Sequence, residues 1–129
     1  MASHRRMIVR NLSKELSMPL QAVYCSSFLC RLRGLTFRRS LPEGESILLV
    51  YDRDSRLDTS IHMLGVPMDL AVAWINSRQV VVDVRLARQW RLAYLPSQPA
   101  CYVLEMSPAR LGDFNVGDRV SFEEVNPVT

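Results

Sequence analysis

The sequence predicts a mostly β fold: a compact sandwich or barrel of about seven short strands, jelly-roll-like, with one short helix. Three observations lead to this fold class. Short apolar runs recur along the whole chain, turn-forming residues separate them, and one brief stretch has helical spacing. The chain has 129 residues, 48% of them hydrophobic and 22% charged, which suits one globular domain. We therefore expect a single domain over residues 1–129, frayed at 1–5 and 126–129.

The first third of the chain predicts two strands and the helix. "MIVRN" (7–11) and "LQAVYC" (20–25) are short, mostly apolar runs typical of strands. Ser26 can cap a helix after the second strand, and Gly34 can end it. Between these two residues, apolar side chains recur at helical spacing: Phe28, Leu29 and Leu32.

The remaining strands follow turn signals. "ILLVY" (47–51) predicts a buried strand, and the charged stretch 52–58 predicts a loop after it. Residues 70–75 are apolar on both faces, as in a central strand, and they form a hairpin with residues 80–86 across the polar turn "NSRQ".

In the second strand of this hairpin we expect one buried, apolar face, formed by Val80, Val82, Val84 and Leu86. Residues 87–99 predict a long irregular connection. "CYVLEM" (101–106) is then a strand, and a last strand after a Gly-Asp turn should bury Val120 and Phe122.

The charge of the chain is unevenly distributed. Residues 1–39 hold eight basic residues and one acid, whereas the rest hold eight arginines and twelve acids, for a net charge of +3. We interpret this as a solvated basic face balanced by an acidic one. Binding of nucleic acid by the basic third is the less favoured interpretation.

Three cysteines, Cys25, Cys30 and Cys101, are too few and wrongly spaced for a zinc site, and we interpret them as reduced structural residues. The first residues are interrupted by charges too often for a signal peptide, and no window is apolar enough to span a membrane. We therefore expect a cytoplasmic protein with no membrane partner.

Several short motifs together resemble a known family. They occur in a fixed order: "RLRGLTFRRSL" (31–41), "SIHM" followed by "PMD" (60–69), "WRLAY" (90–94), "YVLE" (102–105) and "VGDRV" (116–120). They look like the domain of unknown function family 192, also called uncharacterised protein family 0127, from about Ile8 to Phe122. The resemblance implies a compact, mostly β fold and no assigned reaction. The chain departs from the family at "SIHMLGV", where many relatives have Trp-Met-Lys-Asn-Thr, and at "NSRQ", where relatives often have glycine. Many relatives are exported, a property that we do not carry over.

His62 is the only histidine outside the N-terminal tail, and it allows two interpretations. Ser60 and His62 would face the same way in a strand, and with Asp69 they make up the residue types of a nucleophilic triad. No nucleophile elbow accompanies them, so we favour a buried, neutral, hydrogen-bonded histidine. With one histidine beside the tail residue His4, we expect no metal site and no cofactor.

Asp69 precedes the apolar strand 70–75, where a carboxylate needs a partner. Arg38 or Arg31 can supply a guanidinium, and we favour Arg38. A structural ion pair and a functional role are both open.

The connection 87–99 carries arginines and aromatic residues that could stack a planar ligand: Arg88, Trp90, Arg91 and Tyr94. Alternatively, Trp90 covers the core as a lid, and the arginines are merely solvated.

From these residues we expect a non-catalytic binding module. Its cleft should lie near the 87–99 loop and the 60–63 strand, and its partner is a small molecule or a protein that the sequence does not identify. A small hydrolase centred on Ser60, His62 and Asp69 is the alternative.

Overall fold

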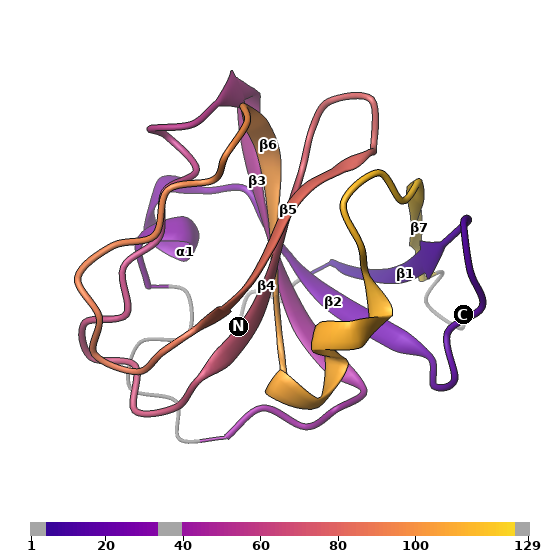
Figure 1. Ribbon diagram of the computed structural model, residues 1–129, viewed down its shortest axis with the longest axis horizontal. Helices are drawn as coiled ribbons and strands as arrows, with labels where there is room; N and C mark the ends of the chain where they lie inside the picture. Colours follow the sequence, from indigo (N-terminus) through magenta and orange to yellow (C-terminus); the bar gives the residue numbers. More distant parts are fainter. Residues whose placement is uncertain (1–4, 34–39, 126–129) are drawn as a thin grey trace.

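The computed structural model describes residues 5–33 and 40–125 and shows a mostly β chain (Figure 1). The seven strands are β1 (Arg6–Asn11), β2 (Leu20–Cys25), β3 (Glu45–Ser55), β4 (Leu70–Ile75), β5 (Val81–Ala87), β6 (Ala100–Met106) and β7 (Val120–Glu124). The helical segments are α1 (Phe28–Arg33) and the 3-10 helix η1 (Pro108–Asp113). The predicted fold class, seven short strands with one short α-helix, is confirmed. No helix within the described residues is long and apolar enough to cross a membrane.

All seven strands belong to one sheet in the order β5-β4-β6-β3-β2-β1-β7. Neighbouring strands are antiparallel, except that β2 and β3 are parallel. A parallel pair needs a crossover connection rather than a tight turn, and α1 lies in this crossover. The predicted β4–β5 hairpin is confirmed.

The two ends of this sheet meet, so that the sheet closes into a barrel. Val80, just before β5, forms an antiparallel bridge with Arg119, just before β7. Beside this bridge, the Val81 amide donates to the Asp118 carbonyl (2.9 Å), and the Gly117 amide donates to the Val81 carbonyl (2.8 Å). At this point of closure the backbone groups of Val80 and Val81 are paired, where an open edge would expose them.

Two apolar clusters occupy the two faces of the sheet. One includes Leu104 and Phe114 and fills the barrel, where η1 packs against β4, β5 and β6. The other includes Trp74, which is fully buried and donates from Nε1 to the Thr59 carbonyl (2.8 Å). Figure 1 shows α1 and the long loops before β4 and β6 on this second side, with η1 on the opposite side. Every residue of β4 is buried, as the two-sided apolar pattern predicted.

The prediction that Val80, Val82, Val84 and Leu86 form the buried face of β5 is wrong. Val82 and Val84 are half-buried, whereas Val81 and Asp83 are buried. A register shift opposite Trp74 interrupts the alternation. The Asp83 carboxylate is tolerated there because it accepts from the Ser97 amide (2.9 Å) and from the Val84 amide (2.9 Å).

Other local expectations also need correction. β3 continues through the charged stretch to Ser55, where we expected a loop. Ser27, not Ser26, caps α1, because its hydroxyl accepts from the Cys30 amide (3.1 Å). Val120 is buried as expected, but Phe122 of β7 is only half-buried.

The expected reduced state of the cysteines is wrong for two of them. Cys25, at the end of β2, and Cys30, in α1, form a disulfide with their Cα atoms 5.5 Å apart. The sharp change of direction between β2 and α1 brings them together. Cys101 is free and buried as expected, and burial together with Asp54 raises the pKa of its thiol to about 12.

Candidate functional site

A cleft of about 470 Å³, which we call the His62 cleft, lies between α1, β3 and the segment before β4. It combines aromatic, hydroxyl, imidazole and charged side chains. These residues are Phe28, Arg31, Tyr51, Asp52, Arg53, Asp58, Ser60 and His62.

One wall of the cleft is a stacked pair. The Arg31 guanidinium lies over the Tyr51 ring, 4.8 Å from its centroid. Its Nη1 donates to the carbonyls of Val50 (3.1 Å) in β3 and of Ser26, directly after β2, so the backbone of two segments holds it in place. Burial raises the pKa of the Tyr51 phenol, and Arg31 opposes that rise. Tyr51 is thus a neutral hydrogen-bond donor at neutral pH.

Ser60 and His62 line the same cleft, as alternation along a strand predicted. Between them, Ile61 exchanges backbone hydrogen bonds with Tyr94 (3.0 and 2.8 Å) and points into the core, as Met63 does. The favoured interpretation of His62 as buried is wrong, because its side chain is exposed. Inward-pointing neighbours on both sides leave it on the outer face of an extended segment.

Asp69 does not line this cleft. Its carboxylate accepts from the Gln89 amide (2.8 Å) and from Arg88 Nη1 (3.4 Å), which anchors the beginning of the loop before β6. Arg38, the favoured partner, lies outside the described residues. Arg31, the other candidate, is stacked on Tyr51. The Ser60 hydroxyl donates to the Leu57 carbonyl (2.8 Å) rather than to His62.

The residues predicted on the 87–99 loop separate into two groups. The Tyr94 hydroxyl accepts from the Arg88 amide (2.8 Å), and its half-buried ring packs on the core, so these two residues shape the loop. Trp90 and Arg91 are exposed and lie outside the cleft. The lid interpretation of Trp90 is wrong: the tryptophan on the core is Trp74.

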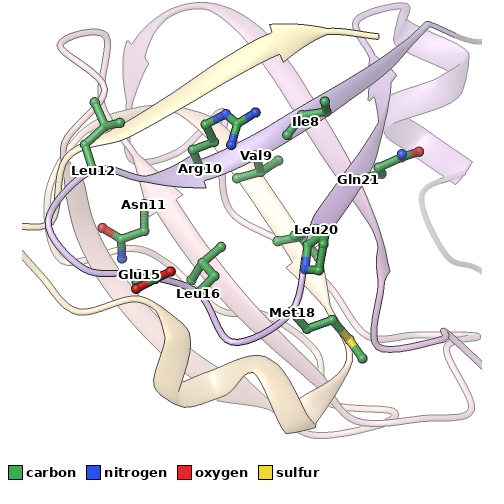
Figure 2. A pocket seen from close by; sticks show the side chains of 11 residues that line it. Ile8, Val9, Arg10, Asn11, Leu12, Glu15, Leu16, Met18, Leu20 and Gln21 are labelled. Atoms are coloured by element: carbon green, nitrogen blue, oxygen red, sulfur yellow. The ribbon is translucent and has the colours of Figure 1, made fainter.

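A second hollow of about 450 Å³, which we call the groove, lies along β1, β2 and the loop between them. Figure 2 shows Leu16, Met18 and Leu20 around it, with Arg10 above. Arg10 pairs with Glu123 of β7 (3.4 Å), and most of this lining is apolar. A mostly apolar lining is common in ligand sites. We nevertheless favour the His62 cleft, because hydroxyl, imidazole and guanidinium groups meet two aromatic rings there, whereas Arg10 of the groove is already paired with Glu123.

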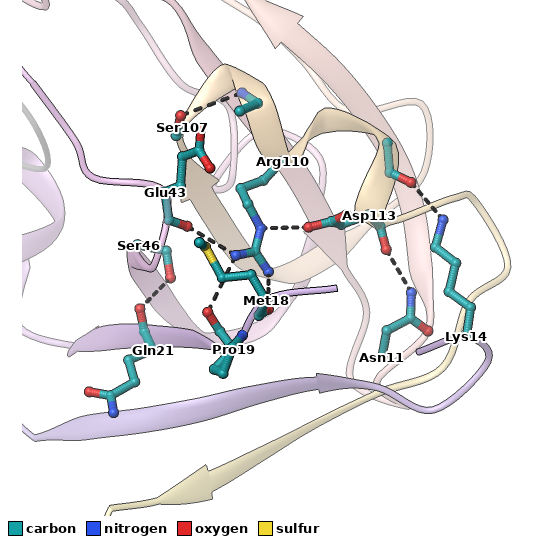
Figure 3. Close-up of polar contacts among 12 residues, drawn as sticks. Asn11, Lys14, Met18, Pro19, Gln21, Glu43, Ser46, Ser107, Arg110 and Asp113 are labelled. Atoms are coloured by element: carbon teal, nitrogen blue, oxygen red, sulfur yellow. Dashed lines mark hydrogen bonds and ion pairs between the residues drawn. The ribbon is translucent and has the colours of Figure 1, made fainter. Parts of the chain in front are cut away.

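Sequence reasoning missed a buried arginine that holds the groove in shape. Arg110 in η1 is 3% exposed. Figure 3 shows its guanidinium donating to the carbonyls of Met18 (2.8 Å), Pro19 (3.3 Å) and Glu43 (3.1 Å), and to the Asp113 carboxylate. The only local signal is Asp113 three residues after Arg110. Every donation to a carbonyl leads to a distant loop, so we assign Arg110 a structural role.

Sequence reasoning also missed Glu105 as a buried acid. Burial raises the pKa of its carboxyl to about 7, and no group within the described residues donates to its Oε1. Its strand position places it opposite Ile47 of β3 and Val72 of β4. The quoted "YVLE" motif contains it, but an acid in an alternating strand is ordinarily placed on the exposed face.

Comparison with known proteins places the chain in a family. The DUF192 family (uncharacterized ACR) matches residues 9–122. A UPF0127 protein of Thermococcus gammatolerans is 34% identical over 99 residues, which cover 75% of this chain and 63% of that protein. A UPF0127 protein of Pyrococcus furiosus is 26% identical over 117 residues, covering 89% and 97%. The chain thus spans less than two thirds of the Thermococcus gammatolerans protein.

A solved structure shares this fold. A protein of Sinorhizobium meliloti, described as a "putative transcription regulator", superposes with a TM-score of 0.77 at 19% identity, covering 95% of this chain and 97% of that chain. A protein of unknown function from Novosphingobium aromaticivorans gives 0.75 at 18% identity, covering 91% and 83%. At these identities the likeness concerns the fold alone.

Proposed function

We propose, from the premise that this chain belongs to the DUF192 family, that it is a non-catalytic binding domain that holds a small molecule in the His62 cleft. The observation that supports this proposal is the meeting of His62, the Arg31–Tyr51 stack and the exposed Phe28 ring around one hollow. Its volume of about 470 Å³ lies within the range of small-molecule sites.

The lining suggests the chemistry of the ligand. The charges of two arginines and two aspartates in the lining cancel, and Arg53 pairs with Asp58 at 3.6 Å. The neutral Tyr51 phenol and the exposed His62 imidazole offer hydrogen bonds, while Phe28 offers a flat apolar face that is 70% exposed. A small planar molecule with polar edges and no large net charge suits these groups.

The sequence predicted a cleft near the 60–63 strand and the 87–99 loop, formed by these two segments. Backbone hydrogen bonds join those two segments instead, so we propose the cleft on the α1 side of Ser60 and His62. The cytoplasmic location stays a prediction, and the Cys25–Cys30 disulfide is unusual for that compartment.

A fragment screen followed by amide NMR shifts tests the proposal. Binders should shift the amides around Tyr51 and His62, and both His62→Ala and Tyr51→Phe should weaken them at least several-fold. Met18→Gln, in the groove between β1 and β2, is the matched control and should leave binding unchanged. Fragments that shift only the groove amides would contradict the proposal.

The hydrolase alternative rests on Ser60 and His62 lining one hollow. It requires Ser60 to exchange its bond to the Leu57 carbonyl for one to His62. A panel of generic ester and phosphoester substrates tests it. We expect no turnover above background, and turnover that disappears in His62→Ala would favour the enzyme instead.

A further inference from the structure

Among residues 5–33 and 40–125, most of the exposed large apolar side chains lie on two loop segments that run side by side. We call residues 56–64 and 88–96 together the Trp90 ribbon. Five of the exposed large hydrophobic residues belong to it: Leu57, Leu64, Trp90, Leu92 and Leu95. We propose that the Trp90 ribbon docks the protein onto the surface of an anionic lipid bilayer. This inference does not rest on the proposed ligand of the His62 cleft, although the ribbon shares Asp58, Ser60 and His62 with the lining of that cleft. It differs from the sequence-based expectation of no membrane partner.

The ribbon is held in place by its backbone. Beyond the Ile61–Tyr94 pair, the Met63 amide donates to the Arg91 carbonyl (2.9 Å), and the Trp90 amide donates to the Met63 carbonyl (3.0 Å). Trp90 has a φ of 66°, a left-handed conformation that bulky residues rarely adopt. The fold thus fixes Trp90 in a strained conformation while leaving 57% of it exposed, and such strain is typical of functional positions.

The charges of the ribbon are mostly positive. It contains Arg56, Arg88 and Arg91 against one acid, Asp58. Asp58 pairs with Arg53, and Arg88 pairs with Asp69 (3.4 Å). Within residues 5–33 and 40–125, no acid pairs with Arg56 or Arg91. An apolar surface with uncompensated arginines is complementary to a negatively charged partner.

A lipid bilayer suits this surface better than the other anionic partners. Single-stranded nucleic acid is bound through several stacking aromatic residues, whereas the ribbon has one exposed tryptophan and four exposed leucines. A second copy that packed its ribbon against this one would bring two surfaces of the same charge together. At a bilayer surface, tryptophan lies at the headgroup level, leucines enter the acyl boundary, and arginines meet lipid phosphates. The two segments form one margin of the molecule, remote from β7 (Figure 1).

Tryptophan fluorescence gives a direct test, because the chain has two tryptophans and Trp74 is fully buried. Vesicles of phosphatidylglycerol and phosphatidylcholine should shift the Trp90 emission to shorter wavelength, and added salt should reverse the shift. Vesicles of phosphatidylcholine alone should give a much smaller shift. Trp90→Phe should abolish the signal.

Variants assign the binding to individual side chains. Arg91→Gln should lower the vesicle partition coefficient, measured by co-sedimentation, about fivefold. Leu92→Gln should lower it about tenfold, because an inserted leucine is lost. Leu12→Gln replaces an exposed leucine outside the ribbon and should leave the vesicle partition coefficient unchanged. Tyr51→Phe alters the His62 cleft but no residue of the ribbon, so it should also leave vesicle binding unchanged. The proposal is overturned by equal binding to neutral vesicles, by no co-sedimentation, or by binding to a single-stranded oligonucleotide in place of vesicles.

Discussion

Glu105 is a buried acid whose protonation depends on folding. Burial raises the pKa of its carboxyl from 4.5 to about 7, so the folded state binds the proton more tightly than the unfolded state. The contribution of Glu105 to stability is therefore fully present below pH 4.5 and is lost as the pH rises through about 7. The total loss is about 3 kcal/mol.

Glu105→Gln should remove this dependence, because glutamine keeps the shape without the charge. In acid, the free energy of unfolding of the variant should match that of the parent. At pH values above the folded-state pKa, it should be about 3 kcal/mol larger, as measured by urea unfolding across the pH range. A stability difference that does not change with pH would contradict the expected burial of the charge.

Arg110 joins three distant carbonyls to η1, and removing its guanidinium removes the hydrogen bonds that they and the Asp113 carboxylate accept from it. Arg110→Ala should lower the free energy of unfolding by about 3–5 kcal/mol. Arg78→Ala is the control. Within the described part of the chain, this exposed arginine makes a hydrogen bond through its backbone amide and none through its side chain, so the free energy of unfolding should stay within about 0.5 kcal/mol of the parent. A loss below 1 kcal/mol for Arg110→Ala would mean that water replaces the guanidinium without cost.

At the scale of elements, α1 depends on its attachment to β2. A helix of six residues is too short to be stable alone, and the Cys25–Cys30 disulfide ties it to the sheet. The double variant Cys25→Ser, Cys30→Ser should lose about 2 kcal/mol of stability. Hydrogen exchange at the Arg31 amide should accelerate, while exchange in β4 stays slow. A reductant should reproduce these effects in the parent and have no effect on the variant; unchanged exchange at Arg31 would show that packing alone holds α1.

The elements that could be predicted from the sequence are those encoded by short-range patterns. All seven strands coincide with short apolar runs, such as residues 70–75, that turn-forming residues bound on either side. The faces of β5, the disulfide and the role of Arg110 depend on partners far along the chain, as Pro19 is 91 residues from Arg110. In the candidate site, the alternation of side chains along a strand correctly predicted that Ser60 and His62 face the same side. The exposure of His62 depends on the pairing of this segment with the segment around Tyr94, which no nearby residue in the sequence indicates.

At the scale of the whole molecule, barrel closure depends on a tight turn before β7. Gly117 has a φ of +96° there, which a side chain disfavours, although a Cβ would meet no atom within 4 Å. Gly117→Ala should therefore cost about 1–2 kcal/mol through the backbone alone. Gly112→Ala, equally open but without a positive φ, should be neutral or slightly stabilising. Thermal unfolding compares the two variants, and equal melting temperatures would show that closure tolerates a relaxed turn.

The pairing of β1 with β7 brings the beginning and the end of the barrel together. The Val125 amide donates to the Arg6 carbonyl (2.9 Å), and Arg5 pairs with Glu124 at 3.1 Å. A short linker can therefore join the two ends, and new ends can be opened at the exposed turn 57–58 without breaking any strand pair. Such a circular permutant should fold to the same barrel. Its cut would lie in the Trp90 ribbon, so that a fluorescent or affinity tag could be attached directly at that surface.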